Sequence, residues 1–395
     1  MRRAAQKVPY YARIFRENGW DPLQAEKYWD RWPILTQQAL QEHREELIAT
    51  DVTKDRLYTD VSGGSSGHTK KFYHSCEYSD STNKAAAYSN SIAGWTPGCR
   101  VAQLWGGPTD ITAASSALAK FRSILACRRL YDCYDISQDR MARYHLELSR
   151  YQPEVMIAYA GAVFQLSRFL KVNNLTPAYP SKSIITSAET LAEDMRSQIR
   201  QVFKKPIFDR YGSREVGLMA FECDAHRGLH IAFTHSLLEV VKPGTLETVC
   251  EQEGDILVTT LAEPSFPLIR YQIGDVAVAT EQQCTCGRNG PKLGKVVGRS
   301  NDFITKADGG RIHGLRFTPV FWRLDKVRQF LVIQQAIDRI EIQLVLSEPL
   351  TGGEKARIIS EFHSQVGDNV RLEVKKVDRI TPLPSGKKAF VISDL

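Results

Sequence analysis

Strand-like and helix-like segments alternate through the middle of this chain, and this order constrains the fold more than any other feature. The predicted strands are short apolar runs, at residues 99–105, 154–160, 183–186 and 207–211. Helical periodicity occurs between them, at residues 109–126, 161–172 and 188–203. Strands separated by helices are typical of an α/β fold with a largely parallel sheet, which is the fold class we expect.

Changes of pattern on either side of this region predict the domain organisation. Residues 1–48 are mainly helical in pattern, with Thr36 as an expected N-cap. Later short runs predict antiparallel strands, at residues 229–233, 236–241, 255–260 and 267–271. A Gly-Arg-Ser-Asn-Asp segment at 298–302 precedes a smaller α+β pattern that ends in a loop from Pro382. We therefore expect a large layered α/β domain with a β-rich subdomain (1–300) and a small α+β domain (301–395).

Charge and cysteine content exclude several classes of protein. The 52 Lys and Arg residues exceed the 45 Asp and Glu residues by 7, and the basic residues are dispersed along the chain. This pattern does not favour a nucleic-acid partner. Eight cysteines in 395 residues are too sparse for a disulfide scaffold. No apolar run approaches the length of a membrane span, so we expect a soluble, cytoplasmic protein without a membrane partner.

A Gly/Ser-rich loop joins two predicted strands, at residues 58–61 and 70–74. It reads Ser-Gly-Gly-Ser-Ser-Gly-His-Thr-Lys from Ser62 to Lys70. Glycines allow backbone N–H groups to approach an anion closely, and the hydroxyls add further donors. The spacing is not that of a Walker loop, because no Gly-Lys-Ser/Thr precedes a helix. Phosphate binding and a simple hairpin turn both explain this segment.

Three further motifs carry groups suited to nucleotide chemistry. Residues 211–217 read Tyr-Gly-Ser-Arg-Glu-Val-Gly and offer an aromatic ring and a carboxylate. Asp275 follows a strand-ending glycine, where its carboxylate suits a ribose diol. Lys387 follows a glycine near the C-terminal end. Taken singly, each has a plainer explanation: a solvated turn, an Asx turn and a solvated basic tail.

Together and in this order, the motifs resemble those of the adenylate-forming (ANL) superfamily, and most closely its phenylacetate-CoA ligase and CapK-like branch. The resemblance covers nearly the whole chain, including segments 8–11, 32–36, 187–189 and 298–299. It implies a small mobile C-terminal domain and ATP-dependent activation of a small carboxylic acid, with an aromatic acid favoured. The product would be an acyl-adenylate with pyrophosphate release, followed by transfer to a thiol, most often coenzyme A.

The resemblance also assigns nucleotide-binding positions. The β- and γ-phosphates would lie against Ser65, Ser66, Gly67, Thr69 and Lys70. The adenine pocket would include Ser187, Ala188, Glu189, Tyr211, Gly212 and Ser213, with Tyr211 stacked on the base. Asp275 would hold the ribose hydroxyls, with help from Arg299.

The expected catalytic positions are Glu215, which would bind Mg²⁺, Lys387, which would bridge the carboxylate and the α-phosphate, and Arg214. The last departs from the superfamily, which usually has Thr or Ser there. Its guanidinium would either contact phosphate or form a structural pair. The hinge position carries Asn301 where Asp or Lys is usual, and Asp302 follows it, so the hinge is either of these two residues. The acid pocket would be lined by Tyr159, Ala160 and Gly161, near Trp105.

Three cysteines and a histidine form a candidate zinc site. Cys284 and Cys286 lie in a tight turn, and Cys223 follows the tyrosine motif. Three thiolates and one imidazole suit tetrahedral structural zinc, and the branch carries a similar Cys-x-Cys-Gly-Arg segment. The resemblance favours His230 as the fourth ligand, because the Gly-Leu-His segment is similar to one in the branch, although His226 gives the tighter spacing. Unpaired core cysteines are the alternative.

Three alternatives to the ligase fit parts of this sequence. An amine, a carrier-protein thiol or another nucleophile would replace coenzyme A without changing the first step. A catalytically silent nucleotide- or zinc-binding scaffold is a second alternative, in which Arg214 and Asn301 would mark lost chemistry. A nucleic-acid binder is the weakest, because no basic patch interleaved with aromatics is present. A homodimer is left open as a partner.

Overall fold

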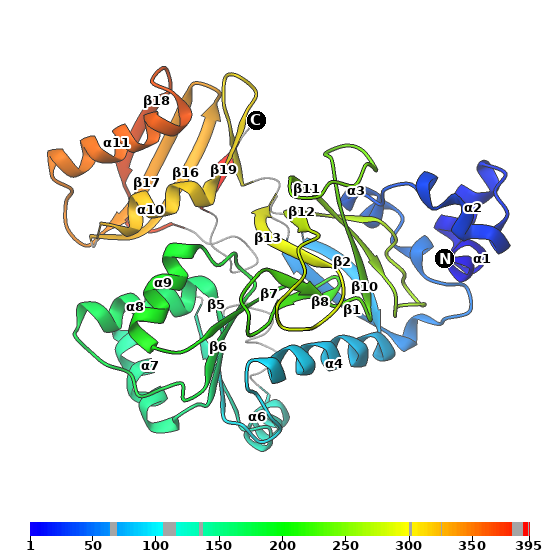
Figure 1. Cartoon of the computed structure of the whole chain (residues 1–395), viewed down its shortest axis with the longest axis horizontal. Coiled ribbons are helices and arrows are strands. Elements are labelled where there is room, and N and C mark those ends of the chain that lie inside the picture. The colour runs from blue at the N-terminus through cyan, green and yellow to red at the C-terminus, as the bar shows by residue number, and fades with distance from the viewer. Residues whose placement is uncertain are drawn as a thin grey trace. The chain divides into compact units, whose positions relative to one another are not determined.

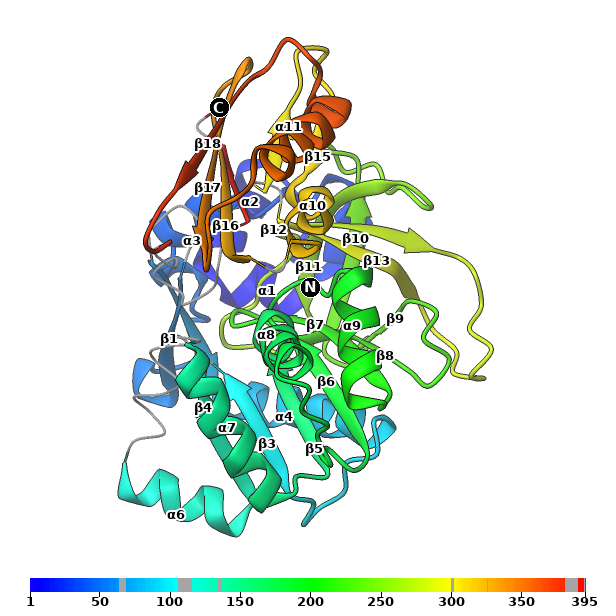
Figure 2. The ribbon, with the colours of Figure 1, turned by 90° about the vertical axis from the view of Figure 1, so that its left-hand side faces the viewer.

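The computed structural model describes the chain apart from residues 64–68, 106–115, 134–136, 300–301, 325, 381–389 and 394. The side chains of Gly63, Thr69, Ala117, Lys120 and Leu315 are also outside the description. The described residues form two compact units, the first ending at Val297 and the second beginning at Gly298. Figures 1 and 2 show the ribbon in two views at right angles.

An eleven-stranded sheet, in the order β10-β11-β12-β13-β9-β8-β7-β6-β5-β3-β4, runs through the first unit. One half is parallel and contains β3 (Val101–Trp105), β4 (Arg128–Asp132), β5 (Val155–Tyr159), β6 (Ser183–Ser187) and β7 (Ile207–Ser213). The expected α/β fold with parallel strands is confirmed. The edge strand β4 was not predicted, because charged and polar residues outnumber apolar ones along it.

The other half of the sheet is antiparallel and corresponds to the predicted β-rich part. It contains β8 (Gly217–Glu222), β9 (Leu229–Ile231), β10 (Ser236–Val241), β11 (Glu253–Thr260), β12 (Tyr271–Thr280) and β13 (Lys292–Arg299). The predicted strand at 267–271 is wrong, since β12 begins at Tyr271. The residues before it bond to the N-terminal segment instead: the Tyr11 hydroxyl donates to Pro267 O, and Leu35 N donates to Arg270 O.

Helices cover both faces of the parallel half, as Figures 1 and 2 show. They are α4 (Cys76–Ile92), α6 (Ala117–Leu125), α7 (Gln138–Tyr151), α8 (Ala160–Val172) and α9 (Glu193–Phe203). The end of α4 packs Ile92 and Ala93 against Ile157 and Ile185. The predicted helix at 188–203 starts too early, because Ala188 has a left-handed φ of 69°.

The N-terminal region is helical, as predicted. It contains α1 (Arg2–Lys7), α2 (Pro9–Glu17) and α3 (Gln37–Glu42), with 3₁₀ turns at Pro22–Arg31, Glu45–Leu47 and Lys54–Arg56. Thr36 caps α3, because Ala39 N donates to its hydroxyl at 3.1 Å. Buried aromatic side chains attach the region to the antiparallel half; among them are Tyr11, Phe15, Trp32, Phe266 and Tyr271.

Strands β1 (Leu57–Gly63) and β2 (Thr69–Ser75) form an antiparallel hairpin, which confirms the two strands predicted around the Gly/Ser loop. Their register pairs Asp60 with Phe72 and Ser62 with Lys70.

The second unit has its own sheets and core. It contains β14 (Phe303–Thr305), β15 (Arg311–His313), β16 (Val327–Ala336), β17 (Arg339–Leu346), β18 (Arg371–Lys376), β19 (Val391–Ser393), α10 (Thr318–Trp322), α11 (Gly352–Val366) and a 3₁₀ turn at Gly314–Phe317. Phe317 and Phe362 stack in its core with centroids 4.3 Å apart. The expected terminal loop is wrong at β19, where Val391 pairs with Val332. Three residues are too few to show a strand period.

None of the helices within the described residues is both long enough and apolar enough to cross a membrane.

Candidate functional site

The carboxyl ends of β5, β6 and β7 meet at one edge of the sheet. Tyr159 is the register partner of Ser187, and Thr186 is the partner of Asp209. The segments that follow these parallel strands therefore leave the sheet side by side. In open α/β sheets, ligands bind outside this edge. The fold thus brings together the predicted acid pocket, the adenine segment and the tyrosine motif.

Tyr211 and Asp275 are joined by a side-chain hydrogen bond. The Tyr211 hydroxyl, from β7, donates to Asp275 Oδ2, from β12, at 2.7 Å. Asp275 is buried and follows Gly274, whose φ of 86° turns the strand locally. An aromatic ring and a carboxylate from distant parts of the chain therefore lie together, in an arrangement that suits a base and a ribose.

Glu215 lies in the tight turn between β7 and β8. The turn requires glycine at two places: a Cβ on Gly212 would lie 2.6 Å from Gly217 O, and Gly217 has a φ of 76°. Glu215 is buried, and its Oε1 accepts a hydrogen bond from Ser62 Oγ at 2.8 Å. The start of the Gly/Ser loop and the predicted Mg²⁺ ligand are therefore in contact.

Arg214 is held by the β1–β2 hairpin on both its side chain and its backbone. Its Nη1 lies 3.6 Å from Asp60 Oδ1, and His74 Nε2 donates to its carbonyl oxygen at 3.1 Å. This ion pair is one of the two arrangements expected for Arg214, and contact with phosphate stays a prediction. From the sequence, Asp60 and His74 had no expected role, and Ser62 was named only as the first residue of the Gly/Ser loop. The period-two placement of Asp60 and Ser62 at the start of that loop was the available signal.

Several other expected site residues either are placed by their position along a strand or lie outside the described residues. Lys70 is buried on β2, and Thr69 begins that strand. Arg299 is the last residue of β13. Ser65, Ser66, Gly67, Asn301 and Lys387 lie outside the described residues.

The adenine segment and the acid-pocket segment are also joined. Ser187 ends β6 and is buried, and Ala188 turns the chain. Glu189 Oε2 then accepts a hydrogen bond from Gly161 N at 2.7 Å. Trp105 and Tyr159, both expected near the acid, have ring centroids 4.4 Å apart.

A group of charged side chains connects strands β6, β7 and β8 with helix α9. Asp209 Oδ1 accepts from the Thr186 hydroxyl at 2.7 Å, and Asp209 N donates to Glu222 Oε2 at 2.8 Å. Arg196 forms an ion pair with Glu222 at 2.7 Å. Burial, followed by the negative charge of Glu222, raises the pKa of Asp209 to about 7.

We expect Asp209→Asn to change how stability depends on pH. Because the folded pKa of Asp209 exceeds its unfolded value, its contribution is fully present below about pH 4 and is lost as pH rises through about 7. The melting temperature of D209N relative to the wild type should therefore rise between those pH values. Thermal unfolding scans at several pH values measure this difference. A constant difference would contradict the raised pKa.

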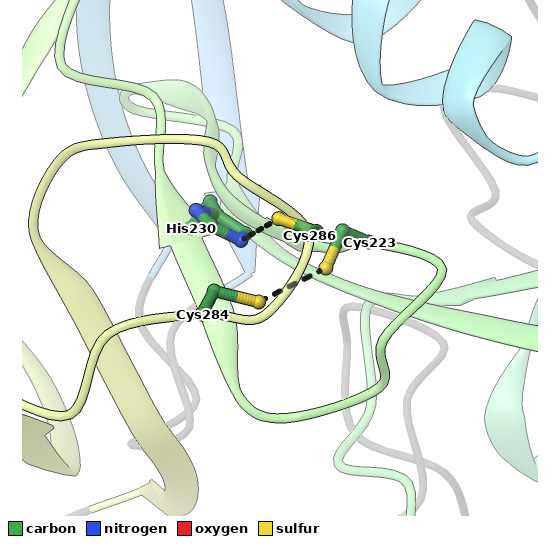
Figure 3. Close-up of side chains that lie close together, drawn as sticks. All are labelled: Cys223, His230, Cys284 and Cys286. Carbon is green, nitrogen blue, oxygen red and sulfur yellow. Dashed lines mark hydrogen bonds between the residues drawn. The ribbon is translucent and has the colours of Figure 1, made fainter.

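Four ligand atoms form a candidate metal centre, drawn in Figure 3: those of Cys223, His230, Cys284 and Cys286, which all lie within 4.8 Å of one another. Cys223 Sγ is 3.5 Å from Cys284 Sγ, and Cys286 Sγ is 3.4 Å from His230 Nε2. Ligands of tetrahedral zinc, at their usual bond lengths, are separated by about 3.5 to 3.8 Å. His226 instead contacts Glu222 at 3.3 Å. The donor set and spacing therefore fit zinc.

The protonation of two of these thiols is shifted in opposite directions. Burial raises the pKa of Cys223 to about 12. Desolvation acts in the same direction on Cys286, but hydrogen bonds from the Arg288 backbone and side chain outweigh it and lower its pKa to about 7. Arg288 also forms an ion pair with Asp224 at 2.9 Å, which joins the same two loops as the cluster.

Known proteins resemble this chain over most of its length. Residues 304–394 match the CapK C-terminal domain family. Protein CapK of Staphylococcus aureus is 25% identical over 377 residues, covering 92% of this chain and 80% of CapK. Phenylacetate-coenzyme A ligase of Thermus thermophilus is 24% identical over 413 residues, covering 97% and 89%.

Among solved structures, 2-hydroxyisobutyryl-CoA ligase in its postadenylation state matches with a TM-score of 0.77 and 19% identity, covering 99% of this chain and 86% of that one. The resemblance noted from the motifs is confirmed: the chain is a relative of the CapK and phenylacetate-coenzyme A ligase proteins, and it has the fold of the adenylate-forming ligases.

Proposed function

We propose that this protein is an AMP-forming acid–thiol ligase, which activates a small carboxylic acid with ATP and passes the acyl group to coenzyme A. The observation that carries the proposal is the bond between Tyr211 and Asp275 at the carboxyl edge of the sheet, 2.7 Å long. This bond supports the proposal because a ring that would stack on the base and a carboxylate that would bind the ribose lie together. The bond between Ser62 and Glu215 adds a carboxylate suited to magnesium in the same turn.

The first step forms a bond between a carboxylate oxygen of the acid and the α-phosphorus of ATP, and pyrophosphate leaves. Tyr211 would stack on the adenine, and Asp275 would accept hydrogen bonds from the ribose hydroxyls, assisted by Arg299. The residues of the Gly/Ser loop would surround the β- and γ-phosphates. In the second step the thiol sulfur bonds to the acyl carbon, and AMP leaves. Positioning and charge neutralisation supply the rate enhancement.

Glu215, Arg214 and Lys387 would each have a different role at the phosphates. Glu215 would hold Mg²⁺, which neutralises phosphate charge when bound, and Ser62 orients that carboxylate by its hydrogen bond. Arg214 would exchange Asp60 for phosphate or keep its pair with Asp60, so its role depends on a 3.6 Å ion pair. Lys387 would bridge the carboxylate and the α-phosphate. Residues 301–395 would act as a small mobile domain that turns about Asn301 and Asp302 between the two steps.

The aromatic residues expected around the acid substrate favour a small aromatic acid. Trp105 and Tyr159 present two rings at an interplanar angle of 60° beside the start of α8. Flat rings pack well in tilted arrangements of this kind. The cysteine–histidine cluster would hold zinc in a structural role, since four protein ligands leave no open position.

Pyrophosphate release from ATP and Mg²⁺ over a panel of aryl and short aliphatic acids tests the proposal. Release should depend on one class of acid, and adding coenzyme A should accelerate it and yield a thioester mass. Acid-dependent release that coenzyme A does not alter would point to an amine, a carrier protein or another acceptor. Absence of release with every acid, together with intact ATP binding, would favour the silent scaffold.

A further inference from the structure

We propose that Glu189 is a positioning residue that couples the acid side of the site to the adenine side, and that Gly161 is the residue that makes this coupling possible. This inference rests on the proposed function and deepens it. Residue 161 would thereby influence ATP binding, although it lies on the acid side.

The start of α8 takes its capping acceptor from another segment. The first N–H groups of a helix lack partners within the helix, and a side chain of the N-cap residue often supplies one. Tyr159, the N-cap of α8, makes no such bond. Instead Gly161 N donates to Glu189 Oε2, 28 residues further along the chain, at 2.7 Å. The negative charge also lies favourably at the positive end of the helix dipole.

The hydrogen bond between Gly161 and Glu189 requires that residue 161 has no side chain. A Cβ added to Gly161 would lie 2.7 Å from Glu189 Oε2 and 3.6 Å from its Cδ. Distances under 3.0 Å are essentially never found for real Cβ atoms, so the carboxylate would have to move. Since the carboxylate is the far end of a flexible side chain, the shift itself costs little, and the expected loss is that of the hydrogen bond to Gly161 N. The backbone of Gly161 is helical and not left-handed, so the demand for glycine comes from the neighbouring carboxylate alone.

The two joined segments belong to different parts of the site. Ser187 and Tyr159 are partners in the parallel ladder, and the left-handed Ala188 directs Glu189 toward α8. Tyr159 packs on Trp105 at the expected acid pocket, whereas Ser187 and Ala188 belong to the expected adenine segment. One hydrogen bond therefore fixes the acid segment against the adenine segment.

Three variants test the coupling: Gly161→Ala, Glu189→Ala and the double variant. We expect each single change to raise the KM for both ATP and the acid about tenfold, which is the scale of losing a hydrogen bond to a charged group. Because both changes break the same contact, the double variant should lose no more than either single variant. Glu189→Gln keeps an acceptor for Gly161 N but loses the negative charge, so both of its KM values should lie between those of the wild type and those of Glu189→Ala. The dissociation constant of ATP, measured by calorimetry, should follow its KM.

Gly353→Ala is the matched control. Gly353 is the second residue of α11, as Gly161 is of α8, and no atom lies within 4 Å of its added Cβ. This variant should leave both KM values unchanged, and a general loss of folded protein would lower kcat without raising KM.

Three results would overturn the coupling. Gly161→Ala with a raised KM for the acid and unchanged ATP binding would show a local steric effect. Additive losses in the double variant would show two independent contacts. If the wild type releases no pyrophosphate with any acid, the proposed function fails, while the ATP dissociation constants of the variants still decide the coupling. A wild type that does not bind ATP would overturn both.

Discussion

Replacing Glu215 by glutamine should lower acid-dependent pyrophosphate release by about a hundredfold at limiting Mg²⁺, and should raise the Mg²⁺ concentration needed for half-maximal rate. Glutamine has the same shape and still accepts the 2.8 Å hydrogen bond from Ser62, so the turn should keep its structure. What it lacks is the negative charge that draws the cation to this buried position. Magnesium titrations of the initial rate measure the effect.

Two further variants show whether the effect of E215Q comes from the lost negative charge at residue 215. Ser62→Ala removes the bond that orients the carboxylate but keeps the charge, so its magnesium requirement should rise less than that of E215Q. Glu17→Gln removes an exposed carboxylate on α2 and should leave the titration unchanged. An E215Q enzyme with the wild-type magnesium requirement would remove Glu215 from the metal site.

Among the substitutions proposed for this protein, Cys284→Ser should cause the largest loss of stability. The wild-type protein should contain about one zinc ion per chain, and the variant little or none, because a structural site needs its full set of ligands. The loop between β12 and β13 would then lose its metal link to the segment between β8 and β9 and keep the ion pair between Arg288 and Asp224. We expect the melting temperature to fall by about 10 °C or more, the scale of several kcal/mol in a chain of this size. Metal analysis and thermal unfolding measure the two effects.

A chelator and a second cysteine variant separate zinc from cysteine chemistry. Chelation should lower the melting temperature of the wild type but leave that of C284S where it is. Cys76→Ser changes an exposed cysteine outside the cluster and should retain both zinc and stability. Folded wild-type protein that is free of zinc would refute the site.

Much of the fold follows from local pattern in the sequence. Strands β5 and β6 are buried at every residue, so each forms an uninterrupted apolar or small-residue run that is easy to recognise. The Gly/Ser loop has strand-forming residues on both sides, and β1 and β2 lie there. Residue type and spacing indicated the three cysteine ligands, whereas the preference for His230 over His226 came from the family resemblance. The fold brings Cys223 next to Cys284 although 61 residues separate them.

The remaining features depend on contacts between distant segments, which local pattern does not encode. Residues 267–270 have the composition of a strand, but the Tyr11 hydroxyl binds their backbone. The Asp60–Arg214 pair requires the hairpin to lie beside the β7–β8 turn. Glu189 was assigned to the adenine pocket by motif position, and its bond to Gly161 follows only from the neighbouring ends of β5 and β6.

The fate of the carboxylate oxygen tests acyl-adenylate formation most directly. The acid identified by the panel would be labelled with heavy oxygen in its carboxyl group and turned over with ATP, Mg²⁺ and coenzyme A, and the products weighed by mass spectrometry. If the carboxylate attacks the α-phosphorus, one labelled oxygen remains in AMP after the thiol takes the acyl group, and pyrophosphate is unlabelled. Label in inorganic phosphate, with ADP as the nucleotide product, would contradict the account, because it would mean attack on the γ-phosphorus.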